Sequence, residues 1–387
     1  MRRRRTIYFD DARHYYLYVF DPPMTMEQAW LPIDQLAGTA VDTFVYGVAC
    51  GGLFYPSKIA PQFQELSRPF TSEYSAAFWR AWTNMQSLVS RGLDPLKVLV
   101  DRAHEQGMEF FASLRMGTAG QAGAVQDGID PSFRVSDGGR GFAHPEVRDH
   151  FLALLQELAS DYEIEGLELD FAAAPGGLDN AFQKAEAVEC TPLMNEYIGR
   201  ISEMARGKDR LVGARIFPTE QMNLSAGLDV RTWLKEGWVD YVTPLFYTTL
   251  LLDPDMPIDW VVETAHEHDV SVYGFLQPDF RDEHRRFHVR QHATPEMLRA
   301  AAANFIDYGV DGLYTWFLPW PLGPVERSLL TELSDHPRLG EGDKQYYLRR
   351  QDPLAAKTGY HAPLPLTIPG ERIGILHRIP FYVSRYS

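Results

Sequence analysis

Residues 166–171, with the sequence GLELDF, decide the fold of this chain. Within a strand predicted over 162–171, Leu167, Leu169 and Phe171 share one face, and Glu168 and Asp170 share the other. Strands that helices cover on both faces are normally apolar throughout. Two carboxylates on one face therefore predict that this face lines the interior of a barrel or a functional site.

Strand and helix patterns alternate around this stretch. Strands are predicted at 5–9, 42–49, 108–115, 162–171, 211–217, 240–247, 270–277 and 311–317. Helices are predicted at 25–37, 73–90, 94–106, 144–161, 189–207, 229–236, 258–268, 294–308 and 324–334. A doubly wound sheet would carry a glycine-rich phosphate loop after its first strand, and none is present. We therefore predict an α/β fold, a (β/α)8 TIM barrel over 1–335 with a small β-type appendage over 336–387.

One local pattern recurs along the predicted barrel. A helix ends at a glycine or polar residue, and an acidic residue then enters the next apolar strand, as at Glu109, Glu165, Asp240 and Asp311. The repetition supports a fold built from similar βα units.

Composition limits the partners of the chain. It has 387 residues and a formal net charge of -15, which argues against nucleic acid and anionic membrane surfaces. No run approaches the roughly 20 apolar residues of a membrane span, and the basic start at 1–5 is followed too soon by polar residues for a signal peptide. We expect a soluble protein, cytoplasmic as the chain stands and exported if a leader has been removed. The sequence does not indicate the oligomeric state.

The carboxyl ends of barrel strands are where activity is expected. Alternation directs Arg115 and Arg215 toward Glu168 and Asp170. Aromatic planes stack on the C–H faces of sugars, and charged or amide groups bind their hydroxyls, so the predicted mouth suits a carbohydrate. The further substrate-binding candidates at strand ends are Asp10, Arg13, His14, Tyr46, Tyr247, Gln277, Trp316 and Trp320.

Other chemistries have weaker support. His284 and His288 have helical spacing but lack the glutamate of a zinc-protease motif, and no Gly-x-Ser-x-Gly elbow is present. The two cysteines carry no nucleophile signature. We expect no metal and no cofactor.

The motifs resemble glycoside-hydrolase-like TIM barrels. The pattern of Arg115-Met116, the HPEVR run at 144–148, the GLELDF strand, GLDV at 227–230 and GLYTW at 312–316 is similar to largely uncharacterised, family-10-like bacterial barrels. A more distant likeness is to family 18 chitinases, but Ala172 stands where their acid would be. The chain also has Gly117-Thr118 and an alanine run at 172–174 where the family-10-like barrels often have polar residues. The resemblance implies the fold and a hydrolase, without a sugar.

We therefore predict a glycoside hydrolase with a carboxylate pair. Asp170 is one member, Glu220 or Asp279 is the other, and Glu168 orients Asp170 and Arg215. One alternative is a non-catalytic carbohydrate-binding barrel. The other is a lyase or related enzyme that holds an acidic glycan with its two mouth arginines.

Overall fold

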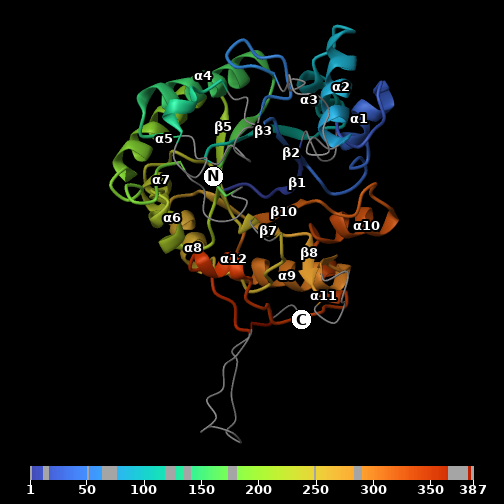
Figure 1. Cartoon of the computed structure of the whole chain (residues 1–387). Coiled ribbons are helices and arrows are strands. Elements are labelled where there is room, and N and C mark those ends of the chain that lie inside the picture. The colour runs from blue at the N-terminus through green and yellow to red at the C-terminus, as the bar shows by residue number, and fades with distance from the viewer. Residues whose placement is uncertain are drawn as a thin grey trace, which may run out of the picture.

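The computed structural model describes residues 2–11, 17–49, 52–62, 76–117, 128–134, 141–172, 181–247, 250–282, 290–364 and 382–384. Eight parallel strands close into a barrel in the order β1-β10-β7-β6-β5-β4-β3-β2. They are β1 (Thr6–Asp11), β2 (Thr43–Gly47), β3 (Glu109–Arg115), β4 (Gly166–Asp170), β5 (Leu211–Ile216), β6 (Tyr241–Pro244), β7 (Ser271–Leu276) and β10 (Gly312–Trp316). Helices surround the barrel (Figure 1). The predicted (β/α)8 barrel is confirmed.

Each predicted helix is present within a few residues of its expected bounds. They are α1 (Met26–Asp34), α2 (Ala76–Val89), α3 (Pro95–Glu105), α4 (Pro145–Asp161), α5 (Thr191–Arg206), α7 (Val230–Lys235), α8 (Asp259–Glu267), α9 (Pro295–Tyr308) and α10 (Pro324–Glu332). Short elements that we did not predict are η1 (Pro131–Phe133), α6 (Glu220–Ser225), α11 (His336–Glu341) and α12 (Pro353–Lys357). Among the described residues, no helix combines the length and apolarity that crossing a bilayer requires.

A two-stranded antiparallel sheet interrupts the barrel pattern between β7 and α9. It pairs β8 (Asp279–Arg281) with β9 (Arg290–His292). Three residues are too few for a periodic signal, which explains why the sequence pattern did not predict these strands. Since β8 follows β7, this hairpin lies at the end of the barrel where the carboxyl ends of the strands meet.

Four acidic residues, three of them from the recurring sequence pattern, join pairs of strands at the opposite end of the barrel. Asp42, Glu165, Asp240 and Asp311 each precede an even-numbered strand of the barrel, counted along the chain. The side chain of each accepts the backbone N–H of one residue on the preceding barrel strand, at 2.6 to 3.2 Å. The backbone N–H of each donates to the carbonyl oxygen of that same residue, at 2.7 to 3.2 Å. The repeated sequence pattern thus encodes three of the four reciprocal clamps. Asp42 forms the fourth, whereas Glu109, the remaining acid of the pattern, accepts a hydrogen bond from Arg5 Nε at 2.8 Å.

The segment after the barrel packs on α9 and on the segment after β6. Tyr347 donates a hydrogen bond to the carbonyl oxygen of Leu252, and the backbone N–H of Ser384 donates to Asn304 Oδ1 at 3.0 Å. The described part of the predicted appendage holds α11, α12 and one isolated β-bridge between Arg350 and Leu364. Residues 365–381 and 385–387 of the predicted β-type appendage lie outside the described residues.

Candidate functional site

Side-chain alternation sorts the barrel residues onto an inner and an outer face. The central carbon of the Arg215 guanidinium lies 3.8 Å from the centroid of the Phe9 ring, and the ring centroids of Phe9 and Trp316 are 5.5 Å apart. The three side chains therefore lie together in the barrel interior. Strand register then places Asp170 and Arg115 on the same inner face, because Arg115 is level with Asp170 and Asp170 with Arg215. The sequence alternation predicted these inward orientations.

Glu168 lies at the centre of a buried network below the mouth. It is 0% exposed, and its carboxylate accepts hydrogen bonds from Ser113 Oγ at 2.8 Å, Tyr241 Oη at 3.0 Å and Tyr314 Oη at 3.1 Å. Arg215 Nε is 2.8 Å from its Oε1. Burial raises the pKa of Glu168, while the Arg215 charge opposes that rise. With four partners and no exposure, Glu168 is suited to positioning its neighbours.

Asp170 lies two residues beyond Glu168 on β4, and therefore closer to the mouth. Its Oδ2 is 3.2 Å from Arg215 Nη1, and its Oδ1 accepts the backbone N–H of Ala172 at 3.1 Å. Arg215 also donates to the Tyr314 hydroxyl at 2.6 Å. The two acids therefore share one guanidinium, and Tyr314 links that guanidinium back to Glu168.

A second pair of opposite charges lies beside the first. Arg115 Nη2 is 3.4 Å from Asp11 Oδ2, and both side chains are at most 10% exposed. Asp11 lies on the inner face because it follows Phe9 at a spacing of two along β1. The sequence places Asp11 at the end of the first strand, but our binding candidates from this strand end were Asp10, Arg13 and His14. The mouth therefore has two inward aspartates, Asp11 and Asp170, with Arg115 beside both.

Aromatic and amide groups complete the inner face. Tyr247 and Trp316 have ring centroids 5.2 Å apart, and the Arg115 guanidinium lies 5.6 Å from the Tyr247 ring. Trp316 Nε1 donates to Gln277 Oε1 at 3.2 Å, and Gln277 Nε2 donates to the Phe246 carbonyl oxygen at 3.0 Å. The predicted binding residues Tyr247, Gln277 and Trp316 therefore lie together with Asp170 in the barrel interior.

Two predicted binding residues point away from this interior. Tyr46 lies among Phe44 and Phe110 on the outer face, with ring centroids 6.4 and 6.2 Å away. Asp10 is level with Tyr46 in the register, so it also faces outward. Because β1 continues to Asp11, alternation along the strand turns Asp11 toward the mouth and Asp10 away from it.

The other predicted residues lie at different places. Trp320 packs edge-on against Phe20 with ring centroids 5.6 Å apart, in the segment after β10. Arg13 and His14 lie outside the described residues.

Glu220 and Asp279, the two candidates for a second carboxylate, lie outside the barrel interior, and each pairs with an arginine. Glu220 begins α6, and Arg231 Nη2 on α7 donates to it at 3.0 Å and lowers its pKa. Asp279 begins β8, where Arg290 of β9 donates to its carboxylate and His292 Nδ1 is 3.3 Å away. Burial raises the pKa of Asp279, with Arg290 and His292 acting against the rise. The structure does not bring either carboxylate into the Asp170 network.

Asp10 gives a prediction about pH. It is 1% exposed, and burial together with the Asp11 charge raises the pKa of Asp10 well above its usual value. A carboxyl whose pKa is higher in the folded than in the unfolded protein contributes its full stabilisation at a pH below its unfolded-state pKa, which is near 4. This stabilisation is lost as the pH rises from that value toward the folded-state pKa. The Asp10→Asn variant should therefore gain stability relative to wild type above pH 4, by up to about 1.4 kcal/mol per pH unit.

Urea unfolding between pH 4 and 8 would measure this gain. The matched control is Asp101→Asn, whose side chain on α3 is 54% exposed and pairs with Lys97. Parallel stability curves for wild type and Asp10→Asn would contradict an uncharged Asp10 in the folded protein.

Gly213 of β5 makes room for the Tyr241 ring, which reaches Glu168. A Cβ atom at residue 213 would lie 1.9 Å from that ring. Gly213→Ala should displace Tyr241 and destabilise the fold by about 1–3 kcal/mol, as overpacked cores do. Gly340→Ala is the control, because a Cβ there meets nothing within 4 Å. Equal denaturation midpoints for the two variants would show that the Tyr241 ring can move away from residue 213 without cost to stability.

No group of three or more His, Cys, Asp or Glu side chains with the spacing of a metal site occurs among the described residues.

Comparisons with known proteins concern the fold. The chain matches no family model and no curated protein. It is similar to the α-L-fucosidase isoenzyme 2 of Paenibacillus thiaminolyticus, with 13% identity and a TM-score of 0.51 over 86% of this chain and 49% of that one. It is also similar to the endo-β-1,4-mannanase of Thermotoga petrophila, with 12% identity and a TM-score of 0.50 over 89% and 79% of the two chains. The chain spans about half of the fucosidase. At these identities the likeness is one of fold, and this protein has a (β/α)8 barrel of the kind on which both glycosidases are built.

Proposed function

We propose that this protein is a glycoside hydrolase whose carboxyl pair is Asp170 and Asp11. The observation that carries the proposal is the inner face of the barrel mouth, where these two aspartates lie with Arg115, Tyr247 and Trp316. Hydrolysis of a glycosidic bond uses one carboxyl to protonate the leaving oxygen and another as base or nucleophile. The Tyr247 ring, which packs on the buried Trp316, would stack on the sugar, and the polar groups would bind its hydroxyls.

The proposed roles follow from the contacts of each acid. Asp170 keeps one oxygen on Arg215 and the other on a backbone N–H, a geometry that fixes its rotamer. A carboxylate held in this way is suited to act as base or nucleophile. Asp11 would then serve as the acid, because the 3.4 Å contact between its Oδ2 and Arg115 Nη2 is longer than the 3.2 Å contact between Asp170 Oδ2 and Arg215 Nη1. Glu168 would act as a positioning residue through Arg215.

A second candidate is a carbohydrate-binding barrel without turnover. It is favoured by one observation: Asp170, Glu168, Glu220 and Asp279 each have an arginine neighbour. An arginine favours the ionised carboxylate, whereas a general acid must carry a proton.

Release of reducing ends from a panel of neutral and acidic glycans tests the proposal. We expect release by the wild-type protein from at least one glycan, with the Asp170→Asn variant as the inactive control. Binding of a glycan in a separate titration, without release, would support the binding barrel and overturn the hydrolase. The lyase alternative predicts an unsaturated product from acidic glycans, which absorbs near 230 nm.

A further inference from the structure

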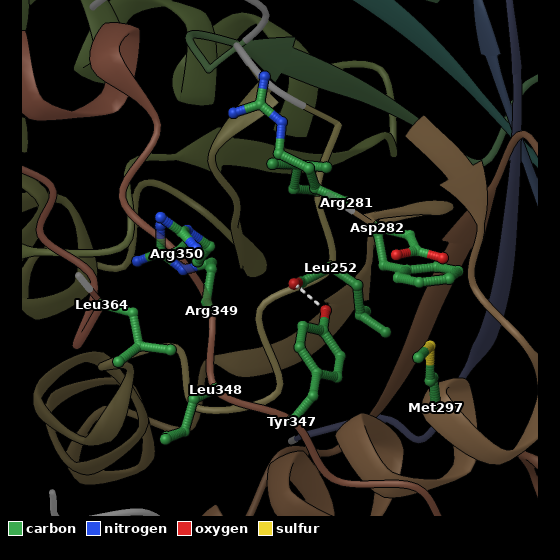
Figure 2. Close-up of a pocket in the computed structure, with 11 residues that line it drawn as sticks. Leu252, Arg281, Asp282, Met297, Tyr347, Leu348, Arg349, Arg350 and Leu364 are labelled. Carbon is green, nitrogen blue, oxygen red and sulfur yellow. Dashed lines mark hydrogen bonds between the residues drawn. The ribbon is translucent and has the colours of Figure 1, made fainter. Parts of the chain in front are cut away.

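A cavity of about 280 Å³ lies beside the candidate site, between the β8–β9 hairpin and the segment that follows the barrel. Leu252, Phe280 and Met297 form one part of its lining, and Tyr347 and Leu348 form another. Figure 2 shows Tyr347 in the middle of the lining, with its hydroxyl directed at the carbonyl oxygen of Leu252. Ligand pockets typically measure about 300–1,000 Å³, so this cavity suits one small ring.

The cavity opens at the same end of the barrel as the mouth. Its lining comes from segments that follow β6 and β7, and in a parallel barrel these segments all leave from one end. Phe280 is three residues beyond Gln277 of the mouth, and three residues span at most about 10 Å. A backbone hydrogen bond of 2.6 Å from Leu252 to Asp279 fixes the hairpin to the segment after β6. A glycan bound at the mouth is therefore close enough to extend into the cavity.

The wall contributed by residues 347–350 is held in place by buried polar contacts. Arg349 Nε lies 3.0 Å from Asp253 Oδ2, and the Arg349 guanidinium is 4.5 Å from the Tyr360 ring. The Tyr360 hydroxyl donates to the same Asp253 oxygen at 2.5 Å. Because both side chains of the Arg349–Asp253 pair are at most 10% exposed, this wall is organised before any ligand arrives.

Arginine dominates the charged part of the lining. Arg281, Arg349 and Arg350 line the cavity with a single acid, Asp282. In Figure 2, Arg349 and Arg350 lie together on one side and Asp282 lies on the other. Arg281 contacts Asp352 through Nη1 at 3.3 Å, and a guanidinium carries five N–H donors, so further acceptors fit around it. Arginines stay charged at every physiological pH and bind carboxylates through paired hydrogen bonds.

We propose that this cavity binds a pyranose that carries a carboxylate, a hexuronate, as a subsite for an acidic glycan. Its carbohydrate class rests on the proposed function, whereas the charge preference rests on the arginines. The C–H face of the sugar would pack on Tyr347 and Leu348, and its carboxylate would bind Arg281 and Arg350. At the mouth, Arg215 is already shared by two carboxylates, those of Glu168 and Asp170, whereas Arg281 in the cavity contacts a single acid among the described residues, Asp352, and a guanidinium has five N–H donors.

Calorimetric titration with glucuronate and with glucose tests the proposal in the Asp170→Asn background, where turnover plays no part. We expect glucuronate to bind at least tenfold more tightly than glucose. Adding Arg281→Gln, and separately Arg350→Gln, should remove this preference, because each change deletes a charge-assisted hydrogen bond. Arg200→Gln is the control, since Arg200 pairs with Asp149 on the helical surface and its side chain is 42% exposed.

The outcomes separate this proposal from the proposed function. Equal affinity for the two sugars, no binding of glucuronate, or binding unaffected by both arginine changes would overturn the subsite and leave hydrolysis of neutral glycans intact. Binding of glucuronate that depends on Arg281, together with no release of reducing ends by wild type, would overturn the hydrolase and keep the subsite.

Discussion

The Asp170→Asn variant should fold normally and lose turnover by a factor of about 10²–10⁴ or more. Asparagine has nearly the same shape as aspartate, so the contacts with Arg215 and with the Ala172 backbone are the ones most affected. An amide can neither accept a proton at neutral pH nor attack the anomeric carbon as a carboxylate does. The loss is therefore expected in kcat, with KM changed less, because Tyr247, the residue proposed to stack on the sugar, remains.

Initial rates on the best glycan of the panel would measure this effect, with circular dichroism as the test of folding. Asp101→Asn is the matched control, since it makes the same chemical change on an exposed helix surface. A rate for Asp170→Asn within twofold of the control would place the catalytic carboxyls elsewhere. The network of Glu168, Asp170 and Arg215 would then be a structural element of the barrel.

Replacing Arg215 with methionine should destabilise the protein by about 3–5 kcal/mol, the usual cost of removing one partner from a buried ion pair. Glu168 and Asp170 are 0% and 2% exposed, so both would be left buried without their shared cation. Methionine keeps most of the side-chain volume, although the contact between the guanidinium and the Phe9 ring is lost. The cost thus reports mainly on the uncompensated charges.

Two further variants make this prediction specific. The double variant Arg215→Met with Glu168→Gln should recover part of the loss, because one of the two buried charges is then also absent. Arg231→Met removes an arginine from the pair with Glu220, where the two side chains are 48% and 39% exposed, and should cost less than about 1 kcal/mol. Denaturant titration measures all three variants. A similar cost for Arg215→Met and Arg231→Met would show that the buried network contributes little to stability.

Sequence alternation was sufficient for the fold and for the inward orientation of several side chains at the mouth. The period of two along 166–171 and along 109–115 assigns Glu168, Asp170 and Arg115 to the inner face without knowledge of any contact. The same rule would have identified Asp11 if the first strand had been extended by two residues. It would also have grouped Tyr314 with Trp316, but aromatic residues in a buried strand are indistinguishable from core by pattern alone.

The remaining features depend on contacts between segments far apart in the chain. Glu220 follows a barrel strand, as a catalytic residue would, and only the position of α7 reveals that Arg231 binds it. Asp279 is similar, because its partner Arg290 is contributed by a three-residue strand without a periodic signal. The cavity beside the mouth combines the hairpin with a segment about 70 residues later in the chain, and no local pattern encodes that meeting.

The four reciprocal clamps divide the barrel into quarters. Each clamp joins an odd-numbered strand to the even-numbered strand that follows it in the chain: β1 to β2, β3 to β4, β5 to β6 and β7 to β10. A cut in the chain between β4 and β5 separates no clamped pair, whereas a cut between β3 and β4 separates one. Each quarter is therefore one continuous stretch of sequence. Recombination at the borders between quarters would exchange a clamped strand pair together with the loops that follow its two strands.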